Sequence, residues 1–142
     1  MKQTILLVDD NEADVDLLRY FLTKGPESPR LVVARDGEEA IQILKHRPPF
    51  SSSPRPDLIV LDLDMPRKNG AEVLNEIRRD PDLQVLPVLI FTTCDSPQKI
   101  ASAYRLNANC CLTKPADLDE YARIVRSIED FWLKAARLPS VS

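Results

Sequence analysis

Five short, uninterrupted apolar runs are the feature that most restricts how this chain can fold. They cover residues 5–8, 31–34, 58–61, 88–91 and 110–112. None of them alternates apolar with polar residues, as a strand with one solvated face does. Continuous runs of this length are typical of strands that are covered on both faces, which occur in parallel sheets between two layers of helices.

Segments with a helical spacing of apolar residues lie between these runs. Val15, Leu18 and Leu22 form one such series, and Val73 and Ile77 belong to another. An alternation of strands and helices predicts a doubly wound α/β fold, (βα)5, with right-handed crossovers. Five parallel strands suit the flavodoxin-like order 2-1-3-4-5, in which ligands bind at the carboxyl ends of the first and third strands.

The chain length of 142 residues suits one domain with one hydrophobic core. We therefore expect a single domain over residues 1–142, with an extended C-terminal helix and tail over residues 117–142 and no output domain. The Pro- and Ser-rich segment 47–56 predicts a surface loop. No apolar run approaches the ~18 residues of a membrane span, and the N-terminus lacks a secretory pattern, so a cytoplasmic location is expected.

The charge balance argues against nucleic-acid binding. The 19 basic and 22 acidic side chains give a net charge of −3, and no dense basic stripe is present. The three cysteines, Cys94, Cys110 and Cys111, are an odd number, and neighbouring strand residues point to opposite faces. Reduced thiols are therefore expected.

Acidic residues follow two of the predicted strands at the expected binding edge. Asp9 and Asp10 come directly after the first strand, and Asp62 comes directly after the third. Three carboxylates that converge in one crevice repel one another, so they need cations to remain ionised. Mg²⁺ suits this environment, because it binds one or two carboxylates, keeps several waters and accepts phosphoryl oxygens.

Two further residues belong to the same edge of the sheet. Lys114 follows the fifth strand, and Thr92 follows the fourth. The lysine and a divalent ion would balance the three carboxylates, which leaves a pocket able to accept a phosphoryl dianion. The hydroxyl of Thr92 can donate a hydrogen bond to a phosphoryl oxygen.

Together these motifs resemble the receiver domain of two-component response regulators, of the chemotaxis-regulator type, over residues 3–133. The matching motifs are Val8-Asp9-Asp10, Leu61-Asp62 with Met65-Pro66 and Gly70, Phe91-Thr92, and Lys114-Pro115. The resemblance implies that Asp62 accepts a phosphoryl group from a histidine kinase. Such a protein catalyses only its own phosphorylation and dephosphorylation, and is not otherwise an enzyme.

The resemblance also implies roles for the other site residues. Asp10, Asp62 and the backbone carbonyl of Asp64 would hold Mg²⁺, and Asp9 would assist the ion through water. Thr92 and Lys114 would contact the phosphoryl group, and the peptide bond between Lys114 and Pro115 would be cis. A carboxylate that attacks phosphorus needs mainly alignment and charge neutralisation, which a metal ion and a lysine supply.

One position departs from the family pattern. Receiver domains usually carry an aromatic residue three positions before the lysine, and its rotamer change accompanies movement of the threonine. Here that position is Cys111, whose side chain is too small for such a movement. Tyr104 in the fourth helical segment is a candidate substitute.

Three further features resemble the single-domain regulators that pair with phytochrome-type histidine kinases in cyanobacteria. They are the Pro-rich loop, the pair Asn109-Cys110, and the C-terminal stretch from residue 128 to residue 139. The resemblance implies a homodimer formed through the fourth and fifth strands and the last helix. That helix has more apolar residues than one sheet face covers, and we assign Tyr121, Phe131 and Trp132 to the interface.

Two alternatives remain at this point. The sequence Asp62-Leu63-Asp64 also resembles the DxD motif of haloacid-dehalogenase-type phosphatases, in which Asp62 would be the nucleophile and Asp64 the general acid. That family places its motif on an early strand and a further acidic pair late in the chain, whereas here the acidic pair comes first. The second alternative is a receiver-like binding module that is never phosphorylated.

Overall fold

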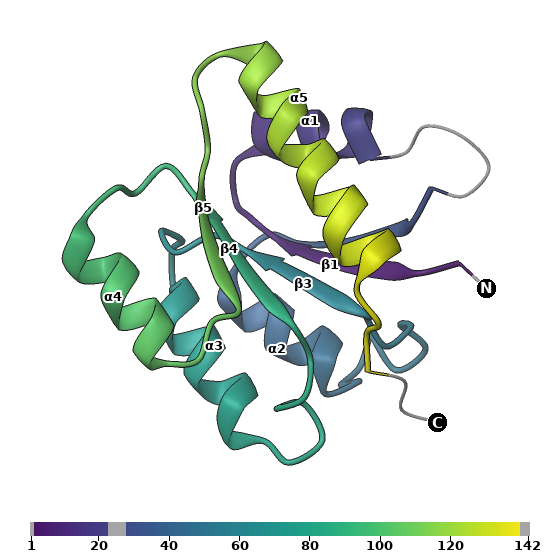
Figure 1. Cartoon of the computed structure of the whole chain (residues 1–142). Helices are drawn as coiled ribbons and strands as arrows, with labels where there is room; N and C mark the ends of the chain where they lie inside the picture. The colour runs from purple at the N-terminus through teal and green to yellow at the C-terminus, as the bar shows by residue number, and fades with distance from the viewer. Residues whose placement is uncertain (1, 23–27, 140–142) are drawn as a thin grey trace.

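A computed structural model describes residues 2–22 and 28–139, in which strands and helices alternate along the chain (Figure 1). The strands are β1 (Thr4–Val8), β2 (Arg30–Ala34), β3 (Leu58–Leu61), β4 (Val88–Thr92) and β5 (Cys110–Thr113). The α-helices are α1 (Glu12–Leu22), α2 (Gly37–Leu44), α3 (Gly70–Arg79), α4 (Pro97–Arg105) and α5 (Leu118–Ile128). Residue 1 and residues 140–142 of the expected domain lie outside the described part.

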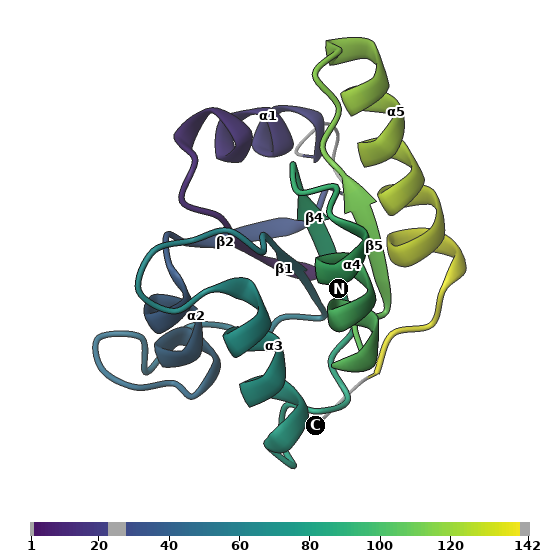
Figure 2. The ribbon, with the colours of Figure 1, turned by 90° about the vertical axis from the view of Figure 1, so that its left-hand side faces the viewer.

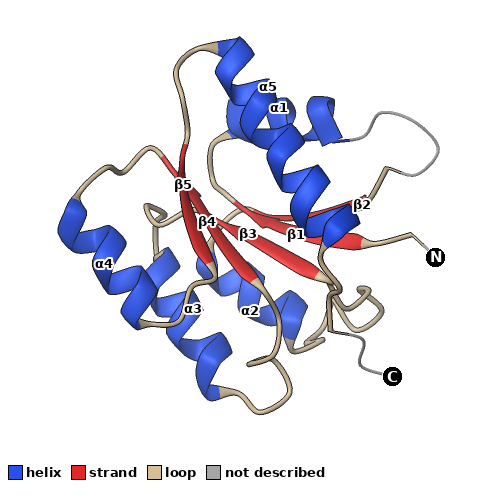
Figure 3. Cartoon of the chain, in the orientation of Figure 1, coloured by secondary structure: helices blue, strands red, loops and turns tan. Residues whose placement is uncertain are grey.

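The strands form one parallel sheet in the order β2-β1-β3-β4-β5, so the predicted fold and strand order are confirmed. The sheet lies between two layers of helices (Figure 3). Helices α1 and α5 cover one face, while α2, α3 and α4 cover the other (Figures 1 and 2). Every residue of β1, β3 and β4 is buried, which is why these strands are apolar without alternation.

Each face of the sheet has its own hydrophobic core. Val15 and Leu18 of α1 and Val125 of α5 pack on one face. Leu74 of α3 and Ala103 of α4 pack on the other. The helical spacing of apolar residues therefore predicted the buried side of these helices.

Side chains at the helix starts satisfy the first free backbone N–H groups. Asn69 and Glu72 form a reciprocal capping box at the start of α3. Asp36, Ser96 and Asp117 accept hydrogen bonds at the starts of α2, α4 and α5. These caps position the loops that lead from the carboxyl ends of the strands into the helices.

The C-terminal helical segment has two parts. Helix α5 ends at Ile128 and continues as a π-helical segment, η1 (Glu129–Ala135). The side chain of Leu118, at the start of α5, is 57% exposed. Tyr121, Val125 and Ile128 of the same helix are buried, so α5 packs against the rest of the domain only from Tyr121 onward.

The remaining predictions about loops, thiols and membrane spans can be compared directly. Segment 47–56 contains only turns and irregular backbone, as predicted. Cys94, Cys110 and Cys111 are free thiols. Among the described residues, no helix has the length and apolar character needed to cross a membrane.

Candidate functional site

Three carboxylates meet where β1 and β3 end. One oxygen from each of Asp9, Asp10 and Asp62 lies within 4.8 Å of the others. Asp9 and Asp62 are buried, whereas Asp10 is exposed. The structure therefore brings together acidic groups from two parts of the chain, because β1 and β3 are neighbours in the sheet.

The backbone fixes the directions in which these carboxylates leave the sheet. The N–H group of Asp9 donates to the carbonyl of Ala34 at 3.0 Å, and the N–H group of Asp62 donates to the carbonyl of Val8 at 3.0 Å. Gly70, at the start of α3, lies against the Asp62 peptide. A Cβ atom at Gly70 would lie 2.2 Å from the carbonyl oxygen of Asp62, so only glycine permits this contact.

Lys114 lies among the carboxylates with its side chain only 4% exposed. Its Nζ atom is 2.6 Å from Asp9 Oδ2, 2.9 Å from Asp14 Oδ2 and 3.5 Å from Asp62 Oδ2. Burial lowers the pKa of Lys114, but the hydrogen bonds to Asp9 and Asp14, together with the negative charges of Asp62 and Asp9, raise it by more, so the net direction is upward. The lysine is therefore a fixed positive charge beside Asp62.

Asp14 is the residue of this site that the sequence did not reveal. It lies in the first turn of α1, where acidic residues are common because they favour the positive end of the helix dipole. Asp10 lies before the first residue of α1, so helical spacing does not link Asp14 to the carboxylate cluster. The hydroxyl of Tyr121 donates to the backbone carbonyl of Asp14 at 3.4 Å.

The donor set fits a divalent cation. Burial raises the pKa of Asp9, and the hydrogen bonds from Lys114 and the Asn11 N–H group only partly oppose this shift. One lysine therefore leaves the three carboxylates short of positive charge. Hard divalent ions prefer carboxylate oxygens, and the exposed carboxylate of Asp10 leaves room for water.

Asp64 lies at the rim of the site. Its N–H group points at Asp62 Oδ1 over 3.4 Å, and its half-exposed carboxylate is 3.5 Å from Lys99 Nζ. A cleft of about 600 Å³ opens beside it, between the loop after β3 and helix α4, and Asp10 forms part of its wall. Asp10 and Asp64 therefore line the same cleft.

Thr92 ends β4 with its side chain 1% exposed. Its Oγ1 atom accepts a hydrogen bond from the Cys94 N–H group at 3.2 Å, which leaves the hydroxyl proton free to donate. The Lys114 N–H group donates to the Thr92 carbonyl at 2.7 Å. The last residues of β4 and the lysine loop are therefore tied together.

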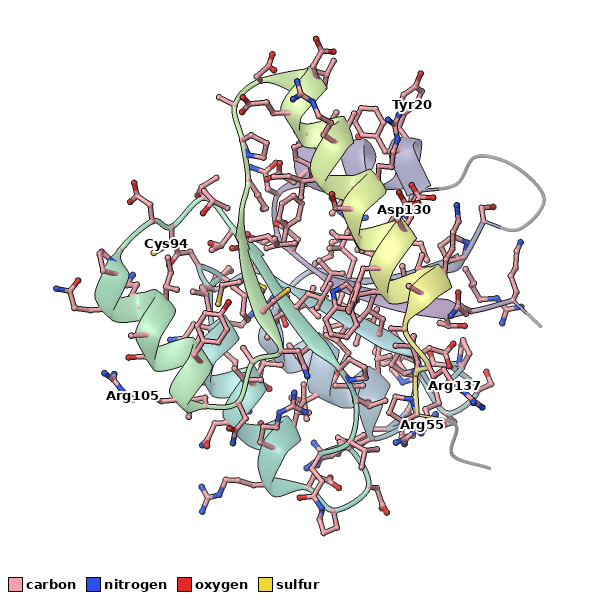
Figure 4. The ribbon with its side chains drawn as sticks, in the orientation of Figure 1. Tyr20, Arg55, Cys94, Arg105, Asp130 and Arg137 are labelled. Carbon is pink, nitrogen blue, oxygen red and sulfur yellow. The ribbon has the colours of Figure 1, made fainter. Side chains whose placement is uncertain are left out.

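Cys111 has a neighbour that the sequence only suggested. The Cys111 N–H group donates to the hydroxyl oxygen of Tyr104 at 3.0 Å, and the Tyr104 side chain is 48% exposed. Burial raises the pKa of Cys111, so its thiol stays protonated. Cys94 lies in the loop before α4 (Figure 4).

Two expectations need correction. Tyr121 is 2% exposed and packs in the core between α1, α5 and the sheet, so it offers almost no surface to a partner. Among the described residues the cis peptide bond is Pro48–Pro49, so the bond between Lys114 and Pro115 is trans. Trans is favoured by only ~0.5–1 kcal/mol in X-Pro bonds, so residue type does not fix the isomer.

Phe131 and Trp132, the other predicted interface residues, differ from each other. Phe131 is 56% exposed. Trp132 is partly buried and packs against the core on the α1 and α5 face. The two rings make an edge-to-face contact with centroids 5.2 Å apart.

Sequence comparison identifies relatives over almost the whole chain. The profile of the family described as "Response regulator receiver domain" matches residues 5–126. "Response regulator Rcp1" from Synechocystis sp. is 40% identical over 138 residues, which is 97% of this chain and 94% of the relative.

Solved structures give the same result. The structure of "the Phosphorylated Cyanobacterial Phytochrome Response Regulator RcpA" superposes with a TM-score of 0.95 at 41% identity, covering 99% of this chain and 100% of that one. The structure of "the Mn(2+)-bound form of response regulator Rcp1" has a TM-score of 0.92 at 40% identity, covering 97% of this chain and 99% of that one. These relatives give no support to the phosphatase alternative.

Proposed function

This chain belongs to the response regulator receiver family, and on that premise we propose that Asp62 accepts a phosphoryl group from a histidine kinase. The observation that carries this proposal is the position of the Asp62 carboxylate. Asp62 directly follows β3, has oxygens of two further carboxylates within 4.8 Å and lies 3.5 Å from the buried ammonium group of Lys114. Asp9 is the other buried carboxylate of this cluster, but its two oxygens already accept hydrogen bonds from Lys114 Nζ at 2.6 Å and from the Asn11 N–H group at 2.9 Å.

The residues of the chain have distinct parts in the transfer. A carboxylate oxygen of Asp62 forms a bond to phosphorus while the bond between phosphorus and the kinase histidine breaks. The ammonium group of Lys114 and the hydroxyl of Thr92 donate to phosphoryl oxygens, where charge is greatest in the transition state. Hydrolysis of the acyl phosphate later restores Asp62, so the protein acts only on itself.

We assign Mg²⁺ to the carboxylate cluster. Asp10, Asp62 and the backbone carbonyl of Asp64 would hold the ion, with Asp9 contributing through water. When bound, Mg²⁺ neutralises negative charge on the carboxylates and the phosphoryl group. The Mn²⁺ named for the related Rcp1 structure supports a divalent ion of this kind.

The kinase partner is proposed to be of the phytochrome type. RcpA is named a phytochrome response regulator, and it matches this chain along nearly its full length. The cytoplasm is the proposed location, since histidine kinases present their phosphohistidine there. Signalling passes through protein contacts rather than through nucleic acid, consistent with a net charge of −3.

A homodimer is the proposed assembly. The exposed ring of Phe131 and the partly exposed ring of Trp132 extend the apolar surface beyond the end of α5. Sedimentation of Phe131→Ala and Trp132→Ala should show weaker dimerisation than wild type. A wild-type protein that sediments as a monomer at all concentrations, with or without phosphorylation, contradicts this assembly.

Tyr104 is the proposed substitute for the aromatic switch residue. Its hydroxyl already lies on the backbone of Cys111, and its half-exposed ring is free to move without leaving a cavity in the core. Tyr104→Phe should keep the fold and phosphorylation, while changing the response of the α4 and β5 surface to phosphorylation in NMR spectra.

Labelling with acetyl phosphate and Mg²⁺ tests the phosphoacceptor. We expect one phosphoryl group per chain in wild type, none in Asp62→Asn, and normal labelling in Asp95→Asn, an exposed control in the loop before α4. Label that survives the Asp62 substitution refutes the assignment. Transfer from a phytochrome-type kinase tests the partner, and steady hydrolysis of added phosphomonoesters would instead favour a phosphatase.

A further inference from the structure

The three N–H bonds of Lys114 are used unequally. Asp9 and Asp14 accept short hydrogen bonds of 2.6 and 2.9 Å from Nζ. The distance of 3.5 Å to Asp62 Oδ2 is too long for a good hydrogen bond, although the two charges attract each other. An ammonium group has three donors, so one donor remains available on the side of the phosphoacceptor.

We propose that Asp14 is a positioning residue for phosphoryl transfer, which acts with Asp9 to hold the ammonium group of Lys114 so that its third N–H bond faces Asp62. The chemical consequence rests on the proposed function of Asp62. The positioning itself is a property of the structure and can be measured without phosphorylation.

Asp14 is suited to this task because its backbone is fixed. It precedes Val15, which is 1% exposed and packs helix α1 against the sheet. The Tyr121 hydroxyl reaches its backbone carbonyl from α5 at 3.4 Å. The Asp14 carboxylate is itself largely buried, with 20% of the side chain exposed, so solvent screens its contact with Lys114 only weakly.

Lys114 needs such a support. It lies in the segment between β5 and α5. Its side chain has a flexible four-carbon stem, which a single contact with Asp9 would not fix. Two carboxylates from different parts of the fold, Asp9 directly after β1 and Asp14 on α1, hold Nζ. A donor that is already in place when the phosphoryl group arrives requires no rearrangement in the transition state.

The key experiment compares Asp14→Ala with Asp14→Asn and with Asp16→Ala. Alanine removes the acceptor, whereas asparagine keeps an acceptor oxygen without the charge. Asp16 is an exposed residue of the same helix, so its replacement matches the change in net charge. At saturating acetyl phosphate and Mg²⁺, we expect Asp14→Ala to slow phosphorylation about tenfold, and Asp14→Asn to retain most of the wild-type rate. Asp16→Ala should equal wild type.

An independent measurement follows the lysine itself. A buried, hydrogen-bonded ammonium group exchanges its protons slowly, so its NMR signal should be visible in wild type and assignable by its loss in Lys114→Met. We expect this signal to broaden or disappear in Asp14→Ala, and to persist in Asp14→Asn and Asp16→Ala. Denaturant titration and amide spectra establish that each variant is folded.

The outcomes separate the two proposals. An unchanged lysine signal in folded Asp14→Ala overturns the positioning role, as does a rate equal to or above that of wild type, which would make Asp14 a competitor for the lysine. If Asp62→Asn still accepts label, the phosphoacceptor assignment fails, while the lysine signal still decides the role of Asp14.

Discussion

Two cationic side chains in this protein make several contacts each, but with different kinds of partner. Lys114 is surrounded by carboxylates at the carboxyl end of the sheet. Arg78, on α3, is surrounded by neutral oxygens at the opposite end. The guanidinium donates to the carbonyls of Gln84, Leu86 and Asn107 and to the side-chain oxygen of Asn109, at 2.7 to 2.9 Å.

The pKa directions follow from these partners. Burial lowers the pKa of Arg78, because no carboxylate offsets the loss of water, although the guanidinium remains charged. The carboxylates around Lys114 raise its pKa despite burial. The neutral oxygens around Arg78 are backbone carbonyls and one amide oxygen, and through them Arg78 joins the loops before β4 and β5. Carboxylates can also bind metal or phosphorus, so the partners of Lys114 are open to exchange.

The largest expected effect comes from Lys114→Met, which keeps an unbranched stem without the charge. Removing one partner of a buried ion pair costs ~3 kcal/mol, because Asp9 and Asp14 are left without a cation. Urea unfolding should show this loss without divalent ions and a partial recovery with Mg²⁺. Phosphorylation should fall ~100-fold even with Mg²⁺. A stability loss that Mg²⁺ leaves unchanged contradicts the view that these carboxylates exchange partners.

Arg78→Lys provides the other half of the comparison. Lysine keeps the charge, but its single nitrogen cannot reach acceptors in two loops, so we expect the free energy of unfolding to fall by ~2 kcal/mol. Mg²⁺ should not restore it, and the phosphorylation rate of the folded protein should be unchanged. Arg79→Lys, at an exposed neighbour, should stay within ~0.5 kcal/mol of wild type. If Arg78→Lys also stays within that range, Arg78 does not join the loops.

The smallest effect on stability is expected at a partly exposed ion pair, which differs from the surroundings of both Lys114 and Arg78. Glu76 accepts a hydrogen bond of 2.6 Å from Lys68, which lowers the pKa of Glu76 from its usual 4.5 and raises that of Lys68 from its usual 10.5. The ion pair therefore stabilises the fold at pH values between the usual pKa of Glu76 and the usual pKa of Lys68. The stabilisation is lost as the pH falls through the lowered pKa of Glu76 or rises through the raised pKa of Lys68.

Glu76→Gln should accordingly reduce the free energy of unfolding by ~0.5 kcal/mol at pH 7, because the pair is partly exposed. The difference from wild type should shrink in acid and in high salt. Denaturant titrations at a series of pH values test this, and a difference that persists below the pKa of Glu76 would assign the effect to packing instead.

Much of the fold was predictable because burial dictates residue type in the sheet. The apolar runs place all the strands within one residue of their observed bounds, with errors only where polar residues such as Thr4 and Thr113 join the strand ends. The π-helical turns of η1 have no comparable signal, since Glu129–Ala135 continues the composition of α5. The change from α-helical to π-helical hydrogen bonds could not be predicted from these residues, because packing decides which backbone groups pair.

The site was predictable to the extent that its residues follow strands. Asp9, Asp10, Asp62, Thr92 and Lys114 all stand at strand ends, which topology brings to one edge. Asp14 lies in a helix, where an acidic residue in the first turn has an ordinary explanation, so its contact with Lys114 depended on how α1 and β5 pack. Tyr121 shows the reverse error, since helical spacing cannot distinguish a core residue from an interface residue.

The contact between Gly70 and Asp62 has a consequence for anyone who diversifies this protein. Because a Cβ atom at position 70 would collide with the carbonyl oxygen of residue 62, any substitution there pushes α3 away from Asp62, the proposed phosphoacceptor. Randomised libraries aimed at new kinase pairings should therefore vary neighbouring exposed positions such as Arg67 and leave Gly70 constant. Deep mutational scanning should find this glycine as intolerant as the aspartate itself, although it takes no part in the chemistry.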